Sequence, residues 1–496
     1  MSVGFEVDLA HRALRKLCTC LPERAGYLVG DVYARTVRAR RFGGRGFDRV
    51  RRALDRSEHF TRSALADLQW RKFKRLLDHA YRNVEWYRRS FAEAGITPDG
   101  IKSYDDLPRI PPLTKDDLRE HTDLLIADGV DRRRLIPRST GGSTAKPVTV
   151  WWDRACYQSA RAATVRWLRY GGVDEVRDRR VWVKRGTYRQ GSDGSDFFGM
   201  YYPTQNEMIF SSTNMTPTVL RAYVERLRRF RPRAVLGYTS GIYVLASYLY
   251  EHGIDDVRID VAQTSSDMLW PEYRKVINTA FHGETFNAYG LAERTCSASE
   301  CERHAGMHVD MELCLMETID EDGRHVFDGT GEILGTNLDN EAMPLIRYRV
   351  NDLGGLSRRL CPCGRESVLL DDFVGRTTDM VTTPDGRQFR LVRIYEIASA
   401  LVGVREFQFM QPSRDLIEVH LVRRQGITEV DATEFIRRMR TLLGEEIRIE
   451  VRCVDVIPTT RGGKKQTVVS RIAAHPVPPA EILANRPIPP AERHGD

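Results

Sequence analysis

The sequence predicts an α/β protein: a large N-terminal domain of layered sheets and helices, followed by a small α+β domain. Three observations support this fold class. Short β-type runs alternate with helical segments between about residues 130 and 375, as in layered α/β cores. The pattern then changes to one compact strand–helix–strand unit near the C-terminal end. Finally, 41% of the 496 residues are hydrophobic and 29% are charged, which suits a chain that buries a large core.

Residues 1–129 are expected to form a helical lead-in to the large domain. Apolar residues recur there mostly every three or four positions, which predicts amphipathic helix. They are Leu65, Leu68, Phe73, Leu76, Leu77, Ala80, Val84 and Tyr87. Further along, Thr114 with Asp117 three residues later predicts the N-cap of another helix.

Residues 130–375 are expected to form the core of the large domain. The predicted strands are VWV (181–183), AVLGY (234–238), TFNAY (285–289) and EILGTNL (332–338), and the predicted helices cover 217–230 and 241–252. Strands that alternate with helices indicate a substantial sheet covered by helices.

Residues 376–475 are expected to form the small C-terminal domain. LIEVHLV (416–422), the helix-like run 431–445 and IRIEVRCVDVI (447–457) predict a compact β-α-β unit of ordinary domain size. The last residues, 476–496, are rich in proline, and we expect a disordered or loosely docked tail there.

The formal net charge is +8, from 76 basic and 68 acidic residues, and much of the excess lies in the arginine-rich segment VYARTVRARRFGGRGFDRVRRALDR. Such a segment can contact acidic lipid or nucleic acid, or it can be a solvated helical face. No aromatic stacking ladder, basic-zipper register or zinc-finger spacing accompanies the arginines. We therefore expect a solvated face and no nucleic acid partner, and contact with a membrane surface stays open as the less favoured alternative.

The sequence offers no run of 18 or more apolar residues and no apolar stretch of signal-peptide type at its start. We therefore expect a cytoplasmic protein. The nine cysteines, an odd number, are scattered through the long chain, which argues against a disulfide scaffold.

The segment RSTGGSTAKP (138–147) combines small, flexible and hydroxyl-bearing residues. Glycines allow close approach of a ligand, and hydroxyl and backbone N–H groups can hold anionic oxygens. The Walker pattern of phosphate-binding loops is absent, because no second glycine stands before Lys146. By composition alone, phosphate binding and an ordinary turn both remain open.

Three further motifs follow along the chain. NAYGLAERT (287–295) places Tyr289 and Glu293 at a predicted strand end, where ligands of α/β folds collect. The tyrosine can stack on a base and the carboxylate can hold Mg²⁺, or the stretch is a surface turn.

LIRYRVNDLG (345–354) ends in Asp352, which can bind the two hydroxyls of a ribose, cap a helix or form a salt bridge. IPTTRGGKKQTV places Lys464 on an exposed loop, where a lysine is usually only solvated.

Taken in this order, the motifs resemble the adenylate-forming (ANL) superfamily, and specifically the phenylacetate–CoA ligase-like branch that includes capsule-cluster ligases. STGGSTAKP resembles the phosphate loop of that branch, with Ala145 where glycine is usual, and NAYGLAE resembles its Tyr-Gly-x-x-Glu motif. RYRVND resembles the ribose motif, GRTTDMV the hinge motif, and RGGKKQTV the terminal Gly-Lys motif. The similarity extends over most of residues 10–475 and also includes the lead-in.

This resemblance implies a large adenylate-forming domain, a small mobile C-terminal domain, and a two-step reaction. A carboxylic acid attacks ATP to give an acyl-adenylate and pyrophosphate, and the acyl group then passes to coenzyme A. The implied catalytic residues are Glu293, as a Mg²⁺ ligand, and Lys464. Asp379 is the implied hinge. The implied nucleotide-binding residues are Ser139, Thr140, Gly141, Gly142, Ser143, Thr144, Lys146, Ser265, Ser266, Asp267, Tyr289, Gly290, Asp352 and Arg376.

Cysteines and a histidine in ECERHAGMH (300–308) and CPCGRE (361–366) are suitable ligands for Zn²⁺. The Cys-x-Cys spacing is tighter than the usual Cys-x-x-Cys, and buried free thiols are the alternative. The same Cys/His pattern occurs in the branch that the chain resembles, which favours a closed structural zinc site. Its expected ligands are Cys301, His308, Cys361 and Cys363, with Cys296 and His304 in reserve.

Several alternatives remain open at this point. The acyl group can instead be passed to an amine, a hydroxyl or a carrier-protein thiol, and a non-catalytic adenylate-binding scaffold is a third interpretation. The acid partner is a small molecule that the sequence does not name. Tyr238 can lie near that acid or can be a core aromatic. The oligomeric state is open, with a dimer among the alternatives.

Overall fold

The computed structural model describes residues 23–33, 44–139, 148–185, 189–190, 196–197, 199–213, 215–320, 322–376, 380–398, 401–459, 465–470 and 472. The proline-rich tail at 476–496 lies outside these residues. Within the described part of the chain, no helix is both long and apolar enough to cross a membrane.

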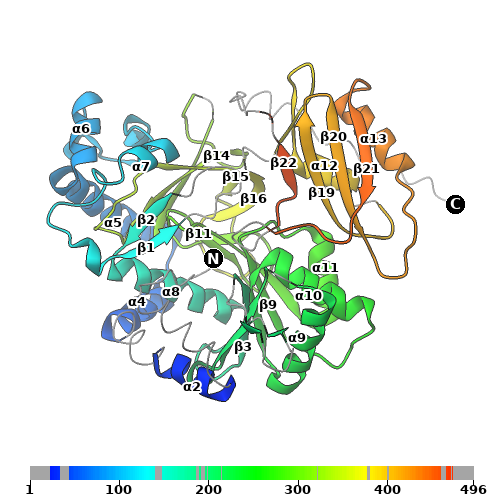
Figure 1. Cartoon of the computed structure of the whole chain (residues 1–496). Helices are drawn as coiled ribbons and strands as arrows, with labels where there is room; N and C mark the ends of the chain where they lie inside the picture. The colour runs from blue at the N-terminus through cyan, green and yellow to red at the C-terminus, as the bar shows by residue number, and fades with distance from the viewer. Residues whose placement is uncertain are drawn as a thin grey trace.

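A large mixed sheet forms the centre of the described structure (Figure 1). Its twelve strands run in the order β13-β14-β15-β16-β12-β11-β10-β9-β8-β3-β7-β6. They are β3 (Arg180–Lys184), β6 (Gly199–Tyr202), β7 (Glu207–Ser211), β8 (Ala234–Tyr238), β9 (Val261–Ser265), β10 (Glu284–Gly290), β11 (Ser297–Glu300), β12 (Met307–Val309), β13 (Cys314–Ile319), β14 (Gly331–Asn337), β15 (Tyr348–Ser357) and β16 (Leu369–Arg376). Each strand predicted within residues 130–375 coincides with one of them.

The five neighbouring strands β10, β9, β8, β3 and β7 are parallel, whereas the remaining pairs of the sheet are antiparallel. Helices cover both faces of the parallel part. α9 (Pro217–Phe230), α10 (Thr239–Glu251) and α11 (Pro271–Phe281) pack on one face, and α8 (Arg154–Tyr170) packs on the other. Since parallel strands end at the same edge, β8, β9 and β10 present their carboxyl ends together.

The described residues of the N-terminal segment form mostly helices. It contains α2 (Glu23–Tyr33), α4 (Arg45–Ser57), α5 (Arg62–Asn83), α6 (Glu85–Glu93) and α7 (Lys115–Glu120). The predicted apolar positions of α5 are buried, except Leu68, which is half-buried. Thr114 caps α7: its hydroxyl accepts from Asp117 N, and the Asp117 carboxylate accepts from Thr114 N.

The C-terminal part builds a separate four-stranded sheet in the order β21-β20-β19-β22. Its elements are α12 (Leu391–Ala398), β19 (Val404–Ser413), β20 (Leu416–Arg423), α13 (Thr433–Leu443), β21 (Arg448–Cys453) and β22 (Val468–Ser470), after the short pair β17 (Met380–Thr382) and β18 (Gln388–Arg390). β20 and β21 are parallel and joined through α13, which confirms the predicted β-α-β unit. The α/β fold class with a C-terminal α+β part is thus confirmed.

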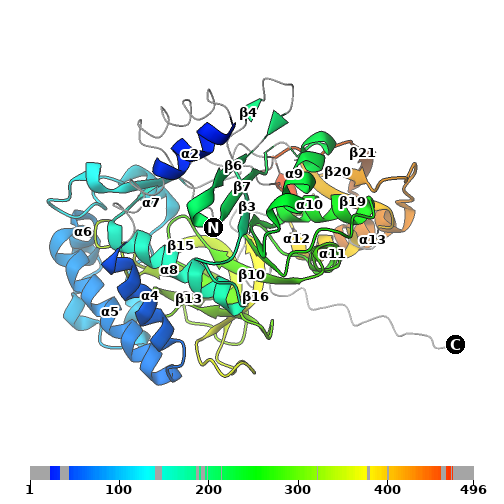
Figure 2. The same cartoon turned by 90° about the horizontal axis from the view of Figure 1, so that it is seen from below.

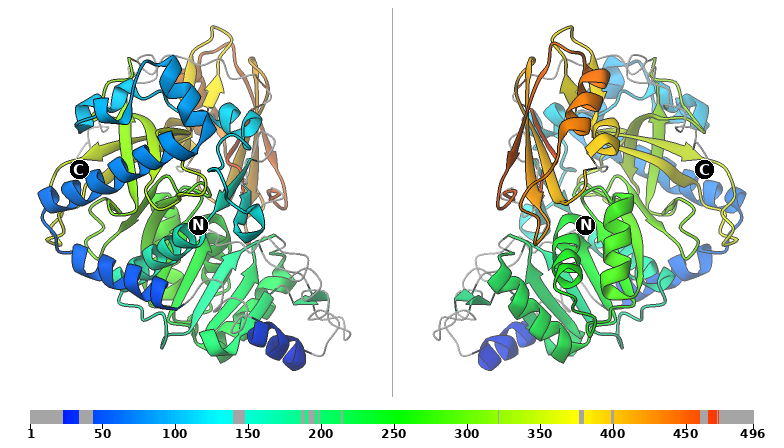
Figure 3. Two further views of the ribbon diagram at one scale, coloured as in Figure 1. Left: turned by 90° about the vertical axis from the view of Figure 1, so that its left-hand side faces the viewer. Right: turned by 90° about the vertical axis from the view of Figure 1, so that its right-hand side faces the viewer.

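This C-terminal part packs against α10 and α11 of the large part (Figure 3). The rings of Trp270 and Tyr395 are stacked with centroids 3.5 Å apart, and Tyr243 Oη donates to the carbonyl of Arg405 at 2.8 Å. The buried carboxylate of Glu251 lies 3.5 Å from the guanidinium of Arg405. Aromatic stacking and ion pairing therefore hold the two parts together in this arrangement.

Candidate active site at the carboxyl edge of the sheet

Tyr289 and Asp352 lie side by side at the carboxyl edge of the parallel strands. Tyr289 Oη donates to Asp352 Oδ2 at 2.7 Å, and both side chains are buried. Tyr289 belongs to the end of β10, and Asp352 lies inside β15, where its Cα partner on β16 is Arg376. The pKa of the Tyr289 hydroxyl is raised because burial and the neighbouring carboxylate both disfavour the phenolate. The tyrosine is therefore a neutral donor that orients the aspartate.

Glu293 lies in the turn that follows β10 and is also buried. Tyr348 Oη donates to Glu293 Oε1 at 3.2 Å. Burial raises the pKa of the Glu293 carboxyl and Asp352 adds to this increase, whereas the ammonium of Lys115 acts in the opposite direction. A buried carboxylate with a nearby cation can bind a metal ion, or it can take up a proton and become neutral.

Lys115 and Tyr348 are two site residues that the sequence motifs did not single out. They come together because Leu113 forms a parallel bridge with Tyr348, so that the start of α7 is attached to β15. Tyr348 stands inside the RYRVND motif, which gave a local signal. Lys115 had no such signal, because its position depends on a contact between segments more than 230 residues apart.

The base of the predicted phosphate loop lies next to this turn. β1 (Ile136–Ser139) and β2 (Thr149–Trp152) form an antiparallel hairpin in which Ser139 pairs with Thr149. Trp152 Nε1 donates to the carbonyl of Ala292 at 3.0 Å, one residue before Glu293. The predicted residues Thr140, Gly141, Gly142, Ser143, Thr144 and Lys146 lie outside the described residues. The two described ends of the loop are thus fixed beside the motif that carries Glu293.

Ser265, Ser266 and Asp267 follow at the end of β9, next to β10. Ser265 is the Cα partner of Ala288, which places this segment beside Tyr289. The carboxylate of Asp267 accepts from both N and Oγ of Ser240 at the start of α10, at 3.3 and 2.8 Å. The aspartate therefore fixes the loop after β9 to a helix start, which is a local structural task.

Two other predicted residues, Lys464 and Asp379, lie outside the described residues. The structure does describe residues on either side of them in the sequence. Arg376 ends β16 beside Asp352, directly before the gap that contains Asp379. Lys465 forms an ion pair with the buried carboxylate of Glu406 on β19.

The predicted metal ligands are brought together from three segments of the chain. The ligand atoms of Cys301, His308, Cys361 and Cys363 all lie within 4.8 Å of one another. The sulfurs of Cys301 and Cys361 are 3.7 Å apart, and Cys363 Sγ is 3.3 Å from His308 Nε2. Tetrahedral Zn²⁺ with bonds of about 2.0–2.3 Å needs ligand separations of roughly 3.3–3.8 Å. The donor set and its spacing therefore fit a zinc ion.

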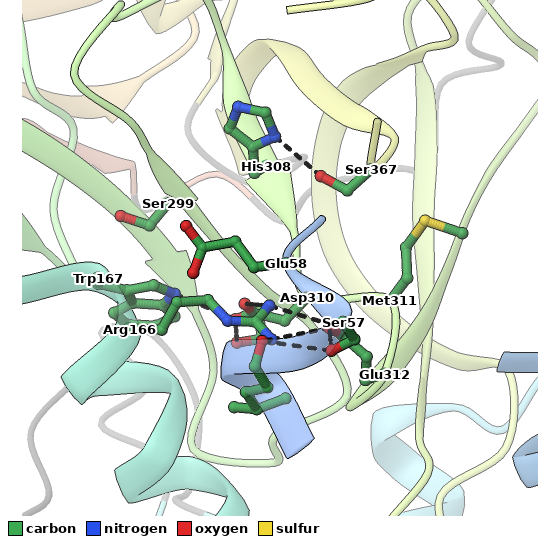
Figure 4. A network of polar contacts seen from close by, with 12 residues as sticks. Ser57, Glu58, Arg166, Trp167, Ser299, His308, Asp310, Met311, Glu312 and Ser367 are labelled. Carbon is green, nitrogen blue, oxygen red and sulfur yellow. Dashed lines mark hydrogen bonds and ion pairs between the residues drawn. The ribbon is translucent and has the colours of Figure 1, made fainter. Parts of the chain in front are cut away.

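The surroundings of His308 also suit a metal ligand. His308 Nδ1 lies 2.8 Å from the hydroxyl of Ser367, so that Nε2 faces the sulfurs (Figure 4). Burial and the guanidinium of Arg365 lower the pKa of His308 to about 4, which keeps the imidazole neutral. The reserve ligands are not part of this group: Cys296 lies in a different apolar cluster, and His304 Nδ1 lies 3.1 Å from a carboxylate oxygen of Glu300.

Directly behind His308, a buried network joins α4, α8 and the segment after β12 (Figure 4). The guanidinium of Arg166 lies 3.1 Å from Asp310 and 2.7 Å from Glu312. Asp310 also accepts from Trp167 Nε1 at 3.1 Å, and Ser57 Oγ donates to Glu312. No local motif indicates this network, because its members are spread over more than 250 residues.

Comparison with known proteins agrees with this architecture. Residues 381–471 match the family model of the CapK C-terminal domain. Phenylacetate-coenzyme A ligase of Thermus thermophilus is 28% identical over 70% of this chain and 78% of its own length. Protein CapK of Staphylococcus aureus is 23% identical over 82% of this chain and 90% of its own length. The predicted resemblance to phenylacetate–CoA ligases and capsule-cluster proteins is therefore confirmed.

A solved structure of 2-hydroxyisobutyryl-CoA ligase, in its postadenylation state in complex with 2-HIB-AMP, has a TM-score of 0.68 to this chain at 20% identity. The match covers 84% of this chain and 91% of that one. At this identity the likeness concerns the fold alone.

Proposed function

We propose that this protein activates a carboxylic acid with ATP and then transfers the acyl group to coenzyme A. The observation that carries the proposal is the pairing of Tyr289 with Asp352 at 2.7 Å, beside the buried Glu293. A nucleotide needs an aromatic face for the base, an acceptor for the ribose hydroxyls and a metal ligand near the phosphates. These three groups meet at one sheet edge, where ligands of α/β folds collect. The similarity to phenylacetate-coenzyme A ligases supports the same activity.

In the first step, an oxygen of the substrate carboxylate attacks the α-phosphorus of ATP. The bond from that phosphorus to the bridging oxygen breaks, and pyrophosphate leaves. Since an anion approaches a polyanion, cationic and hydrogen-bonding groups must stabilise the transition state. In this proposal the loop from Ser139 to Lys146 holds the β- and γ-phosphates, and Lys464 contacts the carboxylate and the α-phosphate. Asp352, oriented by Tyr289, holds the ribose.

The proposal includes two metal ions, each held by different residues. Glu293 would hold Mg²⁺, which would offset the charge of the phosphates when bound. Cys301, His308, Cys361 and Cys363 would hold Zn²⁺ as a closed structural site, since all four positions of a tetrahedral ion are protein ligands. The zinc would fasten Cys301 and the strand β12, which carries His308, to the loop at 361–363.

In the second step, the sulfur of coenzyme A attacks the acyl carbonyl carbon, and AMP leaves with the bonding electrons. The proposal includes a rotation of the C-terminal part about Asp379, which withdraws Lys464 between the two steps. The contacts of Trp270 with Tyr395 and of Glu251 with Arg405 would then have to break.

ATP–pyrophosphate exchange tests the proposal directly. Acid-dependent exchange with a panel of aromatic, aliphatic and amino acids would establish adenylation and name the substrate class. Consumption of coenzyme A thiol would then separate a CoA ligase from an enzyme that acylates an amine, a hydroxyl or a carrier protein. Exchange that is insensitive to Lys464→Ala and Asp352→Asn would overturn the site assignment. Lys102→Ala, at an exposed lysine in the lead-in, is the matched control.

A further inference from the structure

The solvent-exposed face of α4 carries a continuous row of arginines. Arg45, Arg49, Arg52 and Arg56 are all exposed, and their spacing of four, three and four residues aligns them along one side of the helix. At 1.5 Å per residue, the row extends over about 16 Å. The opposite side of α4, with Phe47, Val50 and Leu54, packs into the core against α8. The row therefore points away from the protein.

These four side chains have no ion-pair or hydrogen-bond partner within the described residues. In contrast, Arg51 on the flank of the same helix pairs with Asp55 at 3.1 Å. One acidic residue, Asp48, lies at the edge of the row. Four uncompensated guanidinium groups in a line produce a strong local positive potential, in addition to the net charge of +8.

An apolar element lies on the same side of the molecule. α2 and α4 both lie along the lower side in Figure 1, and both face the viewer in Figure 2, which shows the molecule from below. Leu28 and Val32, one helical turn apart on α2, are 64% and 51% exposed. Large aliphatic side chains that protrude on the same side of a protein as a basic surface are typical of contact with the headgroup–acyl boundary of a membrane.

We propose that this side of the protein, defined by Arg45, Arg49, Arg52 and Arg56 with Leu28 and Val32, docks on the surface of an anionic lipid membrane. The arginines would contact the lipid phosphates, and the two aliphatic side chains would enter the headgroup region. A nucleic acid partner fits less well, because no exposed aromatic side chain accompanies the arginines on α4 to stack on bases. The proposal does not depend on the catalytic activity, since α4 contributes no residue to the candidate active site.

Cosedimentation of the full chain with vesicles tests this inference. The protein should bind vesicles of phosphatidylcholine with about 30% phosphatidylglycerol, and not vesicles of phosphatidylcholine alone, since the attraction depends on anionic lipid. Binding should weaken strongly as salt is raised from about 0.05 M to about 0.5 M, because the Debye length shortens.

Replacing the four arginines of the row by glutamine should weaken binding by roughly 600-fold, since each basic residue near the surface contributes about fivefold. The matched control replaces Arg89, Arg119, Arg132 and Arg324, which are paired with acidic neighbours, and changes the net charge by the same amount. The double substitution Leu28→Ser and Val32→Ser should reduce the vesicle binding that remains at high salt. Absence of binding by the unaltered protein, equal loss in both arginine variants, or tighter binding to single-stranded RNA than to vesicles would each overturn the proposal.

Discussion

Replacement of Arg166 by methionine should destabilise the large part of the protein severely. Arg166 lies between two buried carboxylates, at 3.1 Å from Asp310 and 2.7 Å from Glu312. The three side chains are only 5%, 2% and 7% exposed, so that solvent hardly screens their interaction. Methionine fills a similar volume but leaves two uncompensated carboxylates in the core.

The expected cost follows from the burial of this network. Removing one partner of a buried ion pair typically costs about 3–5 kcal/mol, mostly because the remaining charge is buried without compensation. A rescue experiment separates this cause from lost packing. If Asp310→Asn and Glu312→Gln are added to Arg166→Met, the charges disappear and we expect recovery of at least half of the loss.

The loss should also depend on pH in a defined direction. In the native protein the guanidinium of Arg166 helps to hold the pKa of Glu312 below its usual value, although burial acts in the opposite direction. This interaction stabilises the fold above the pKa of an unfolded glutamate and is lost as the pH falls through the lower folded pKa. Without Arg166, burial is opposed only by weaker effects, such as the hydrogen bonds from Ser57 and Ser297, and both carboxyl pKa values rise. The carboxyls then take up protons on acidification, so the difference between variant and native protein should be smaller at about pH 5 than at about pH 8.

Urea unfolding followed by tryptophan fluorescence at both pH values measures these effects. Arg51→Met is the matched control, because its pair with Asp55 is far less buried, with side chains 38% and 29% exposed, and such pairs are worth about 1 kcal/mol or less. A loss below about 1 kcal/mol for Arg166→Met, or a loss that grows on acidification, would refute the argument from buried charge.

Three further results are expected. Tyr289→Phe should raise the KM for ATP in pyrophosphate exchange about 10-fold or more, because Asp352 loses a charge-assisted hydrogen bond; an unchanged KM would contradict the assigned role. Protein purified without added zinc should contain about one equivalent of zinc, and Cys363→Ser should lose most of it; equal zinc in both by mass spectrometry would exclude the site. Tyr395→Ala should speed proteolysis between the two parts of the chain, since the stack on Trp270 is lost; an unchanged cleavage rate would show that this stack does not hold them together.

Local features of the fold were predictable from the sequence, whereas the order of strands was not. The helix predicted over 217–230 coincides with α9, because a proline at its first position and an apolar stripe define it locally. Thr114 and Asp117 likewise form a capping box within one turn. The twelve-stranded order places β16 between β15 and β12, and such pairings depend on contacts between distant segments that no local pattern encodes.

The candidate site shows the same contrast between local features, which the sequence predicts, and long-range contacts, which it does not. The four zinc-ligand candidates were predictable because cysteine and histidine at short spacings are chemically conspicuous. Tyr289 and Asp352 were proposed from separate motifs, but their hydrogen bond joins residues 63 positions apart. The role of Asp267 as an acceptor for Ser240 was not predicted, because the start of α10 carries no motif of its own.

The contacts around the terminal lysine motif bear on how its position can be controlled. Thr459 and Lys465 form an antiparallel bridge, so that the segment between them starts and ends at one point of the C-terminal part. Lys465 is further tied to the buried Glu406 on β19. Lys464 is the covalent neighbour of Lys465 and lies outside the described residues. In the proposed mechanism, a rotation of the C-terminal sheet would carry Lys465, and Lys464 with it, relative to the candidate active site, and the contacts of Trp270 and Glu251 would set the energy of that rotation.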